Sequence, residues 1–171
     1  MTGSCSTLNL LAYNDTKEAI KKDPSKGKGE FKTVTIWKDG ALAETTARSF
    51  TIKTDEPTPL GGGDTAIDPM ELLLGALGSC LTIGWITQAN LKRIKYKNLK
   101  IEVTAPFDLQ GYLALDKNVR PGFSELKYQV QVETDAEKEI LEEIRKASEK
   151  LSPMFDNILN KTKIEGEIIY V

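Results

Sequence analysis

Cys80 is the side chain with the clearest capacity for chemistry, and it stands in an uncharged run that extends from Leu72 to Leu91. The chain contains no histidine, which excludes Ser-His-Asp and Cys-His catalysis and the commonest general base at neutral pH. Because the run brings no cation, an arginine or lysine that ionises this thiol must come from another element. The sequence therefore allows a thiolate nucleophile that is activated from outside its own helix.

Cys80 also has a simpler interpretation, as a small apolar residue of a protein core. Burial among leucines and alanines disfavours a thiolate, and the residue lies about three turns from the start of its helix, where the helix dipole has little effect. The rate at which peroxide oxidises the thiol separates the reactive interpretation from the structural one.

The rest of the composition narrows the classes of partner. Lys and Arg number 23 against 25 Asp and Glu, a net charge of -2, which gives no reason to expect nucleic acid or a membrane surface. Without histidine a zinc site is not expected, and Gly61-Gly62-Gly63 lacks the lysine of a nucleotide-binding loop, so we expect neither metal nor cofactor. Cys5 and Cys80 form at most one disulfide and no signal peptide is evident, which predicts a reduced, cytoplasmic protein.

The run around Cys80 begins with strong helix-start signals. Asp68 can cap the free amides, Pro69 suits the first helical position, and Glu71 can complete a capping box. A helix from there to Leu91 is about 30 Å long, which is also the thickness of a bilayer core.

This predicted helix is interpreted as a protein core rather than a membrane span. It carries several polar residues, and amphipathic soluble segments flank it. A helix that is apolar on all sides without lipid must be surrounded by protein, and a chain of 171 residues encloses such a helix poorly by itself. Gly75 and Ser79, four residues apart, permit close approach of another backbone. We therefore expect a homodimer that shares central helices or sheets. The polar residues are Ser79, Thr82, Thr87, Gln88 and Asn90.

The other elements follow from hydrophobic period and turn residues. Residues 1–30 are polar and are interpreted as an N-terminal arm and linker, with a short helix at 14–22. Asp39-Gly40 favours a hairpin between two strands, and a third strand passes through 50–53. We expect further strands at 99–105, 108–115, 126–132 and 163–171, and helices at 134–151 and 153–159. The fold class is α+β.

Three separated blocks resemble the OsmC/Ohr family. They read DEPTPLGGGDTAIDPMELLLGALGSCLTIGWITQANL, then DLQGYLALDKNVRPGFSELKYQVQVETDA, then KLSPMFDNIL. The resemblance covers residues 31–171 and implies an OsmC-like domain with antiparallel sheets wrapped around a long buried central helix. It also implies an intertwined homodimer with active sites at the subunit interface.

The resemblance implies a thiol peroxidase that reduces organic hydroperoxides, with Cys80 in the position of the attacking cysteine. The family's second cysteine, which resolves the sulfenic acid as a disulfide, is replaced by Ser152, which can cap a helix but cannot form that bond. An external thiol reductant, or Cys5, must then act in its place.

Members of the family use an arginine and a glutamate to ionise the thiol. This chain has Met70 at the position of that glutamate. The next residue, Glu71, lies about 180° around the helix from Cys80, which favours a capping role. Arg48 is the predicted cation and Arg120 the alternative.

Two functions from different classes therefore stand. The first is a thiol-dependent reductase of small-molecule peroxides with Cys80 as nucleophile. The second is a non-catalytic dimer that binds an apolar small molecule at the subunit interface, and a purely structural dimer with an inert thiol is a third, weaker hypothesis. A fold alone does not choose among them, because function resides in the site.

Overall fold

The computed structural model describes residues 8–170 and contains both helices and antiparallel sheets. Residues 8–75 form one compact unit and residues 76–170 form another. A single long helix, α2 (Pro69–Leu91), begins in the first unit and ends in the second. The prediction of an α+β fold is confirmed.

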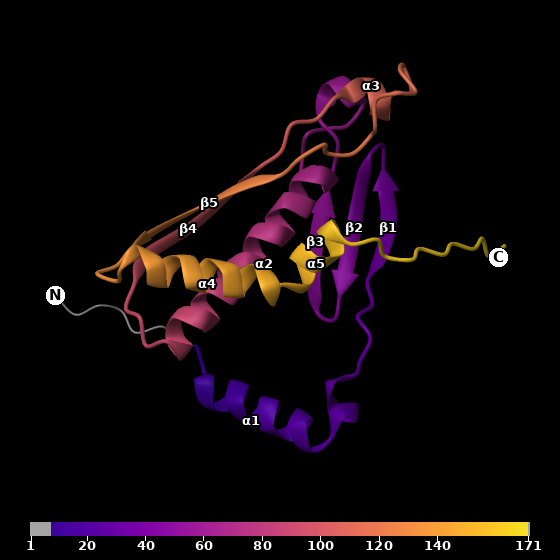
Figure 1. Cartoon of the computed structure of the whole chain (residues 1–171). Helices are drawn as coiled ribbons and strands as arrows, with labels where there is room; N and C mark the ends of the chain where they lie inside the picture. Colours follow the sequence, from indigo (N-terminus) through magenta and orange to yellow (C-terminus); the bar gives the residue numbers. More distant parts are fainter. Residues whose placement is uncertain (1–7, 171) are drawn as a thin grey trace. The chain divides into compact units, whose positions relative to one another are not determined.

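The first unit contains a helix and a three-stranded antiparallel sheet in the order β1-β2-β3 (Figure 1). Helix α1 (Leu10–Lys22) starts four residues earlier than the predicted short helix, because the side chain of Asn9 accepts a hydrogen bond from the amide of Ala12. A short turn of 3-10 helix, η1 (Pro24–Gly27), follows.

The predicted hairpin is confirmed. Strands β1 (Val34–Asp39) and β2 (Leu42–Ala47) pair antiparallel, and Gly40 adopts a φ of +52° in the turn between them. A positive φ of this kind is one that glycine adopts without strain. Strand β3 (Phe50–Thr54) then pairs with β2. Every residue of β1 is exposed within the chain.

A buried carboxylate organises the loop that follows β3. Asp55 is only 3 % exposed, and its side chain accepts hydrogen bonds from the amides of Glu56, Gly63 and Thr65 and from the hydroxyl of Thr65. The Thr65 hydroxyl and amide hold the pKa of Asp55 below its ordinary value. The loop includes a second 3-10 turn, η2 (Thr58–Leu60).

The start of α2 has the predicted capping box. The Asp68 carboxylate accepts the amide of Met70 at 2.6 Å, and the Glu71 carboxylate accepts the amide of Asp68 at 3.1 Å. These bonds satisfy amides that have no partner inside the helix.

Helix α2 is long and apolar enough to cross a membrane by length and composition alone, with a mean hydropathy of 1.5 over its most apolar window. The central helix of a soluble protein meets the same two criteria. Only 17 % of the window is buried within the described chain, and Ile83 is 61 % exposed. The described chain by itself thus leaves much of α2 uncovered.

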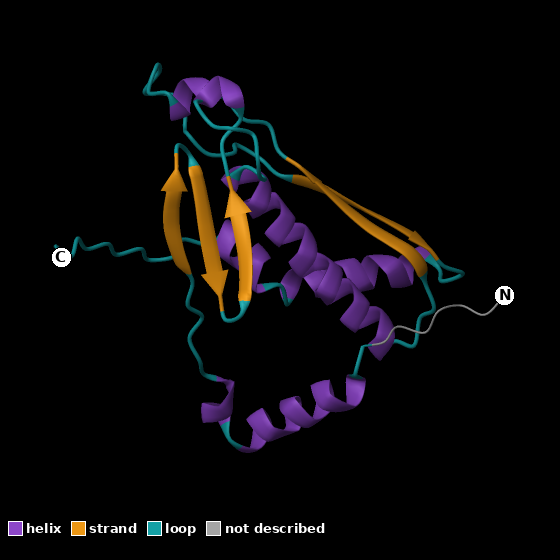
Figure 2. Ribbon diagram, turned by 180° about the vertical axis from the view of Figure 1, so that it is seen from behind, coloured by secondary structure: helices purple, strands orange, loops and turns teal. Residues whose placement is uncertain are grey.

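In the second unit, strands β4 (Lys97–Thr104) and β5 (Lys127–Glu133) form an antiparallel hairpin. One face of this hairpin packs on α4 (Lys138–Lys150) and on the C-terminal part of α2 (Figure 2). The buried residues of this core are Trp85, Ala89 and Ile144.

Helices α2 and α4 cross closely (Figures 1 and 2). A Cβ atom added at Gly84 would lie 3.3 Å from the Cβ atom of Ser148, so the glycine permits the contact. One turn beyond that contact, α4 ends and the short helix α5 (Pro153–Leu159) begins, with Ser152 as its N-cap.

Three further predicted elements differ in the structure. The predicted strand at 108–115 is a helical turn, α3 (Leu109–Tyr112), because the Asp108 carboxylate caps the amide of Gln110. A Cβ atom added at Gly111 would lie 2.5 Å from the carbonyl oxygen of Arg120, so this segment packs against the following loop instead of pairing as a strand.

The helix predicted from residue 134 begins later, at Lys138. Thr134 is not its N-cap: its hydroxyl donates to the carbonyl of Lys95 and accepts a bond from the amide of Ala136, and Glu137 holds the N-cap position without a side-chain bond. The expected closing strand at 163–171 does not form in its described part, residues 163–170, which are exposed and pair with no strand of the described chain. The apolar residues of this tail, Ile164, Ile168, Ile169 and Tyr170, are 74–92 % exposed.

Candidate active site

The candidate site is a pair of side chains from two helices of the second unit. Cys80 lies on α2, carries a free thiol and is half-buried. Ser152 is the N-cap of α5 and is 4 % exposed. The Ser152 hydroxyl oxygen lies 3.1 Å from the Cys80 sulfur, within hydrogen-bond distance.

The Ser152 hydroxyl has two partners. Its oxygen accepts a hydrogen bond from the amide of Phe155 at 3.1 Å, which caps α5, and the same hydroxyl contacts Cys80. The predicted capping role of Ser152 is therefore confirmed. The contact with sulfur is an additional role that the local sequence does not reveal.

The C-terminal end of α4 is held to β5 by a hydrogen-bonded group of three side chains. The Tyr128 hydroxyl donates to the Glu149 carboxylate at 2.5 Å, and the Arg145 guanidinium donates to the same carboxylate oxygen at 2.6 Å. Burial and the bond to Glu149 raise the pKa of Tyr128 to about 12. Because the amide of Ser152 donates to the carbonyl of Glu149, this group also fixes the backbone from which Ser152 projects.

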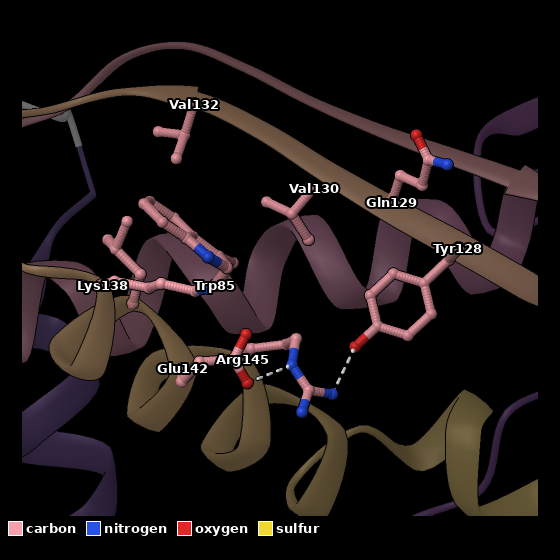
Figure 3. A pocket seen from close by; sticks show the side chains of 9 residues that line it. Trp85, Tyr128, Gln129, Val130, Val132, Lys138, Glu142 and Arg145 are labelled. Atoms are coloured by element: carbon pink, nitrogen blue, oxygen red, sulfur yellow. Dashed lines mark hydrogen bonds and ion pairs between the residues drawn. The ribbon is translucent and has the colours of Figure 1, made fainter.

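A cavity of about 430 Å³ lies between β5 and α4, beside the same group (Figure 3). Apolar side chains of Trp85, Val130 and Leu141 form part of its wall. Its volume is within the range of small-molecule sites. The guanidinium of Arg145, however, is already paired with Glu142 and Glu149, so the cavity does not indicate one class of ligand. Its lining residues are Trp85, Tyr128, Gln129, Val130, Val132, Lys138, Leu141, Glu142 and Arg145.

The three residues predicted to activate the Cys80 thiol each make contacts close to their own position in the chain. Glu71 completes the capping box of α2. Arg48 occupies the turn between β2 and β3 with a φ of 56°, and its guanidinium lies 5.0 Å from the centre of the Phe50 ring. Arg120 lies in the loop before β5, where its guanidinium approaches Gly122. The roles of Arg48, Glu71 and Arg120 in activating Cys80 stay predictions. Cys5 lies outside the described residues.

Sequence reasoning did not identify Arg145, Glu149 or Tyr128 as neighbours of the site. An acidic and a basic residue four apart on a helix normally indicate a solvent-exposed pair, and Tyr128 fits the alternation of a half-buried strand. The contacts among these three side chains form only when α4 packs against β5, and no short sequence pattern specifies that packing.

Comparison with known proteins identifies a family. The model of the family described as OsmC-like protein matches residues 61–167, more than half of the chain. No curated protein sequence matches the chain.

Solved structures agree with the family model at the level of the fold. An OsmC-like protein from Mycoplasma pneumoniae has a TM-score of 0.67 and 15 % identity, covering 77 % of this chain and 89 % of its own. An organic hydroperoxide resistance protein OsmC from Legionella pneumophila has a TM-score of 0.55 and 16 % identity, covering 77 % and 91 %. An organic hydroperoxide resistance protein from Elizabethkingia anophelis has a TM-score of 0.55 and 13 % identity, covering 75 % and 87 %.

Proposed function

Since this chain belongs to the OsmC-like protein family, we propose that it reduces organic hydroperoxides through the thiol of Cys80. The observation that carries the proposal is the free, half-buried sulfur of Cys80 on α2, with the hydroxyl of Ser152 3.1 Å away. Two proteins of similar fold are named organic hydroperoxide resistance proteins, which supports this class of substrate.

The first step consumes the peroxide. The Cys80 thiolate attacks one peroxide oxygen, the O–O bond breaks, and the alkoxide leaves and takes a proton to become an alcohol. The sulfur is oxidised to sulfenic acid and the peroxide is reduced. No metal or flavin is needed, because both electrons come from the sulfur.

The second half of the cycle uses an external thiol, because Ser152 has no sulfur with which to form a disulfide. A small thiol attacks the sulfenic acid, releases water and forms a mixed disulfide with Cys80. A second thiol then attacks that disulfide, releases the oxidised small thiol as its own disulfide and restores the Cys80 thiol. Such a supply of thiols suits a reducing cytoplasm, where we place the protein.

The proposal assigns the ionisation of Cys80 to Arg48, with Arg120 as the alternative cation, while Glu71 caps α2. A neighbouring guanidinium favours a thiolate over a thiol. Replacement of the activating arginine by alanine should slow peroxide reduction, whereas replacement of the other arginine should not. Equal rates for both variants and the unmodified protein would remove arginine from the mechanism.

We also propose that the working form is a homodimer. Ile83 on α2 and the apolar side chains of residues 163–170 are exposed in the single chain, and large exposed apolar surface can mark an interface. A second copy that packs on α2 would cover its open face with protein.

The experiment that tests the function compares oxidation of Cys80 by cumene hydroperoxide and by hydrogen peroxide. Trapping with dimedone followed by mass spectrometry identifies the sulfenic acid and its position. We expect adduct on Cys80, faster with the organic peroxide, and none in a Cys80→Ser variant. A rate no greater than that of a free small thiol would exclude the peroxidase. If, in addition, an apolar molecule copurified with the protein, the peroxidase proposal would give way to a dimer that binds an apolar small molecule.

A further inference from the structure

We infer that Ser152 is a hydrogen-bond donor that stabilises the Cys80 thiolate, in addition to being a helix cap. This inference rests on the proposed function, because it names a second residue in contact with the reacting sulfur. Two features of the structure carry it: the direction of the Ser152 hydroxyl and its burial. A third point makes it testable, because the hydroxyl oxygen caps α5 whereas the hydroxyl hydrogen bonds the sulfur.

The direction of the hydroxyl follows from its partners. A serine hydroxyl has one hydrogen and two acceptor lone pairs. The amide of Phe155 donates to the oxygen and therefore occupies a lone pair. A thiolate has no hydrogen, so between Ser152 and an ionised Cys80 the only hydrogen is that of the hydroxyl. At 3.1 Å the hydroxyl must point to the sulfur.

Burial makes this donor difficult to replace. Ser152 is 4 % exposed, so water has little access to the position that its hydroxyl occupies. A hydrogen bond to the charged form of a group favours that form, and bonds to charged groups are stronger than those between neutral groups. Loss of the hydroxyl should therefore remove a stabilising contact from the Cys80 thiolate.

The capping and donor roles can be separated by substitution. Capping uses the oxygen lone pair, whereas the bond to sulfur uses the hydrogen. Glycine is a tolerated N-cap that weakens a helix only slightly relative to serine, while alanine is a much poorer one. Ser152→Gly therefore removes the donor with little damage to α5, and Ser152→Thr retains both the oxygen and its hydrogen.

Ser148 provides a matched control. It is a buried serine one turn earlier on α4, 2 % exposed, and its hydroxyl donates to the carbonyl of Ile144 at 2.7 Å instead of to sulfur. A Ser148→Ala variant therefore removes a buried serine hydroxyl next to α2 without removing the donor to Cys80.

The test measures the rate at which iodoacetamide alkylates Cys80 between pH 6 and pH 10, with thermal unfolding of each variant recorded in parallel. In Ser152→Gly we expect alkylation at pH 7 to be about tenfold slower, the effect of about 1.4 kcal/mol, and the pH-rate profile to move to higher pH. Ser152→Thr should restore the profile, and Ser148→Ala should leave it in place. A purely structural role would lower the melting temperature without moving the profile.

The outcomes separate this inference from the proposed function, because alkylation requires no peroxide. A folded Ser152→Gly protein with an unchanged profile would overturn the donor role even if Cys80 reduces peroxides. A shifted profile in a protein that reduces no peroxide would retain the donor and exclude the peroxidase. Should Ser152→Gly fail to fold, Ser152→Asn, which keeps an oxygen to cap α5 but has no hydroxyl hydrogen, takes its place under the same criteria.

Discussion

Cys80 and Ser152 are 72 positions apart in the chain, and their side chains meet at 3.1 Å. A residue in the place of Ser152 that carried sulfur would therefore lie close to bonding distance of Cys80, since a disulfide brings two sulfurs to about 2.0 Å with small adjustments of the side chains. The serine keeps the contact but excludes the bond. This predicts that one substitution changes the chemistry of the pair from hydrogen bonding to disulfide formation.

We predict that Ser152→Cys, treated with an organic hydroperoxide, forms a disulfide between Cys80 and the introduced thiol without any external thiol. Intact mass spectrometry and a thiol count should show the loss of two thiols relative to the reduced variant. The bond should stabilise the oxidised protein by about 4 kcal/mol, as expected from the closure of a loop of this length. The reduced variant serves as its control. The reduced variant has three thiols, Cys5 included, so one should remain free. Absence of a disulfide between Cys80 and the introduced cysteine would show that the two side chains do not approach each other as described.

At the scale of single elements, the loop after β3 depends on one ionised carboxylate. The pKa of Asp55 is lowered in the folded protein, chiefly by the hydroxyl of Thr65. A carboxylate with a depressed pKa stabilises the fold above its unfolded pKa, and that stability is lost as pH falls through 3.8 toward the folded value. The loop is therefore predicted to loosen in acid.

We expect Asp55→Asn to be less stable than the unmodified protein at pH 7 and to lose less stability between pH 5 and pH 2. The amide side chain retains one oxygen, but its NH₂ group faces donors that it cannot bind. Urea unfolding at several pH values measures both effects. Asp64→Asn, an exposed change in the same loop, is the control. An Asp55→Asn protein with the same pH dependence as the original would contradict the assignment.

Tyr128, which links β5 to α4, contributes stability that is lost at high pH, whereas the contribution of Asp55 is lost at low pH. The pKa of Tyr128 is raised to about 12, chiefly by burial. The contribution of its neutral hydroxyl is present below the unfolded pKa near 10 and is lost as pH rises through 12. Ultraviolet titration should therefore find a tyrosine that ionises near pH 12.

Tyr128→Phe should remove this late titration and destabilise the protein by about 1 kcal/mol, because it deletes a hydrogen bond to a charged group while Arg145 still satisfies Glu149. Tyr112→Phe is the control, since Tyr112 is 56 % exposed and lies outside this hydrogen-bonded group. Unfolding in urea at pH 8 gives the free energies. If both variants lost equal stability, the Tyr128–Glu149 bond would not be what holds α4 to β5.

The sequence predicts an element correctly where the determining contacts are local. The capping box of Asp68 and Glu71 spans four residues, and the hairpin at Gly40 needs only its two neighbouring strands, so both were recognisable. Thr134 fits a helix cap equally well, yet its hydroxyl donates to the carbonyl of Lys95, 39 positions away, and accepts the amide of Ala136, and the helix begins only at Lys138. The difference lies in tertiary contacts that compete with local propensity.

The candidate site also contains features that depend on local sequence and features that depend on tertiary contacts. Cys80 and Ser152 could be singled out individually, one as a thiol in an uncharged helix and the other as the cap before Pro153. Their contact depends on how α4 crosses α2 at Gly84, and the role of Arg145 depends on how α4 meets β5. Neither crossing leaves a pattern in a single sequence, so local roles such as capping were predictable and contacts between distant residues were not.

At the scale of the whole molecule, exposed apolar surface argues for a second copy of the chain. The tail at 163–170 alternates little with polar residues near its end and pairs with no strand of the described chain, while the side chain of Ile83 projects from α2 with 61 % of its surface exposed. Large exposed apolar side chains of this kind are buried when a second copy packs on them. A dimer that buries it would also enclose α2, as its uncharged composition requires.

We predict that the purified protein sediments as a dimer and that Ile83→Glu shifts it toward monomer, because an unpaired carboxylate at an interface is costly to desolvate. Sedimentation velocity over a range of protein concentrations measures the shift, and the dimer should weaken at least tenfold in dissociation constant. Lys146→Glu, a change of charge at an exposed position of α4, is the control and should leave the dimer intact. A monomer in the unmodified protein would mean that the open face of α2 has another cover, and the proposed dimer would fail.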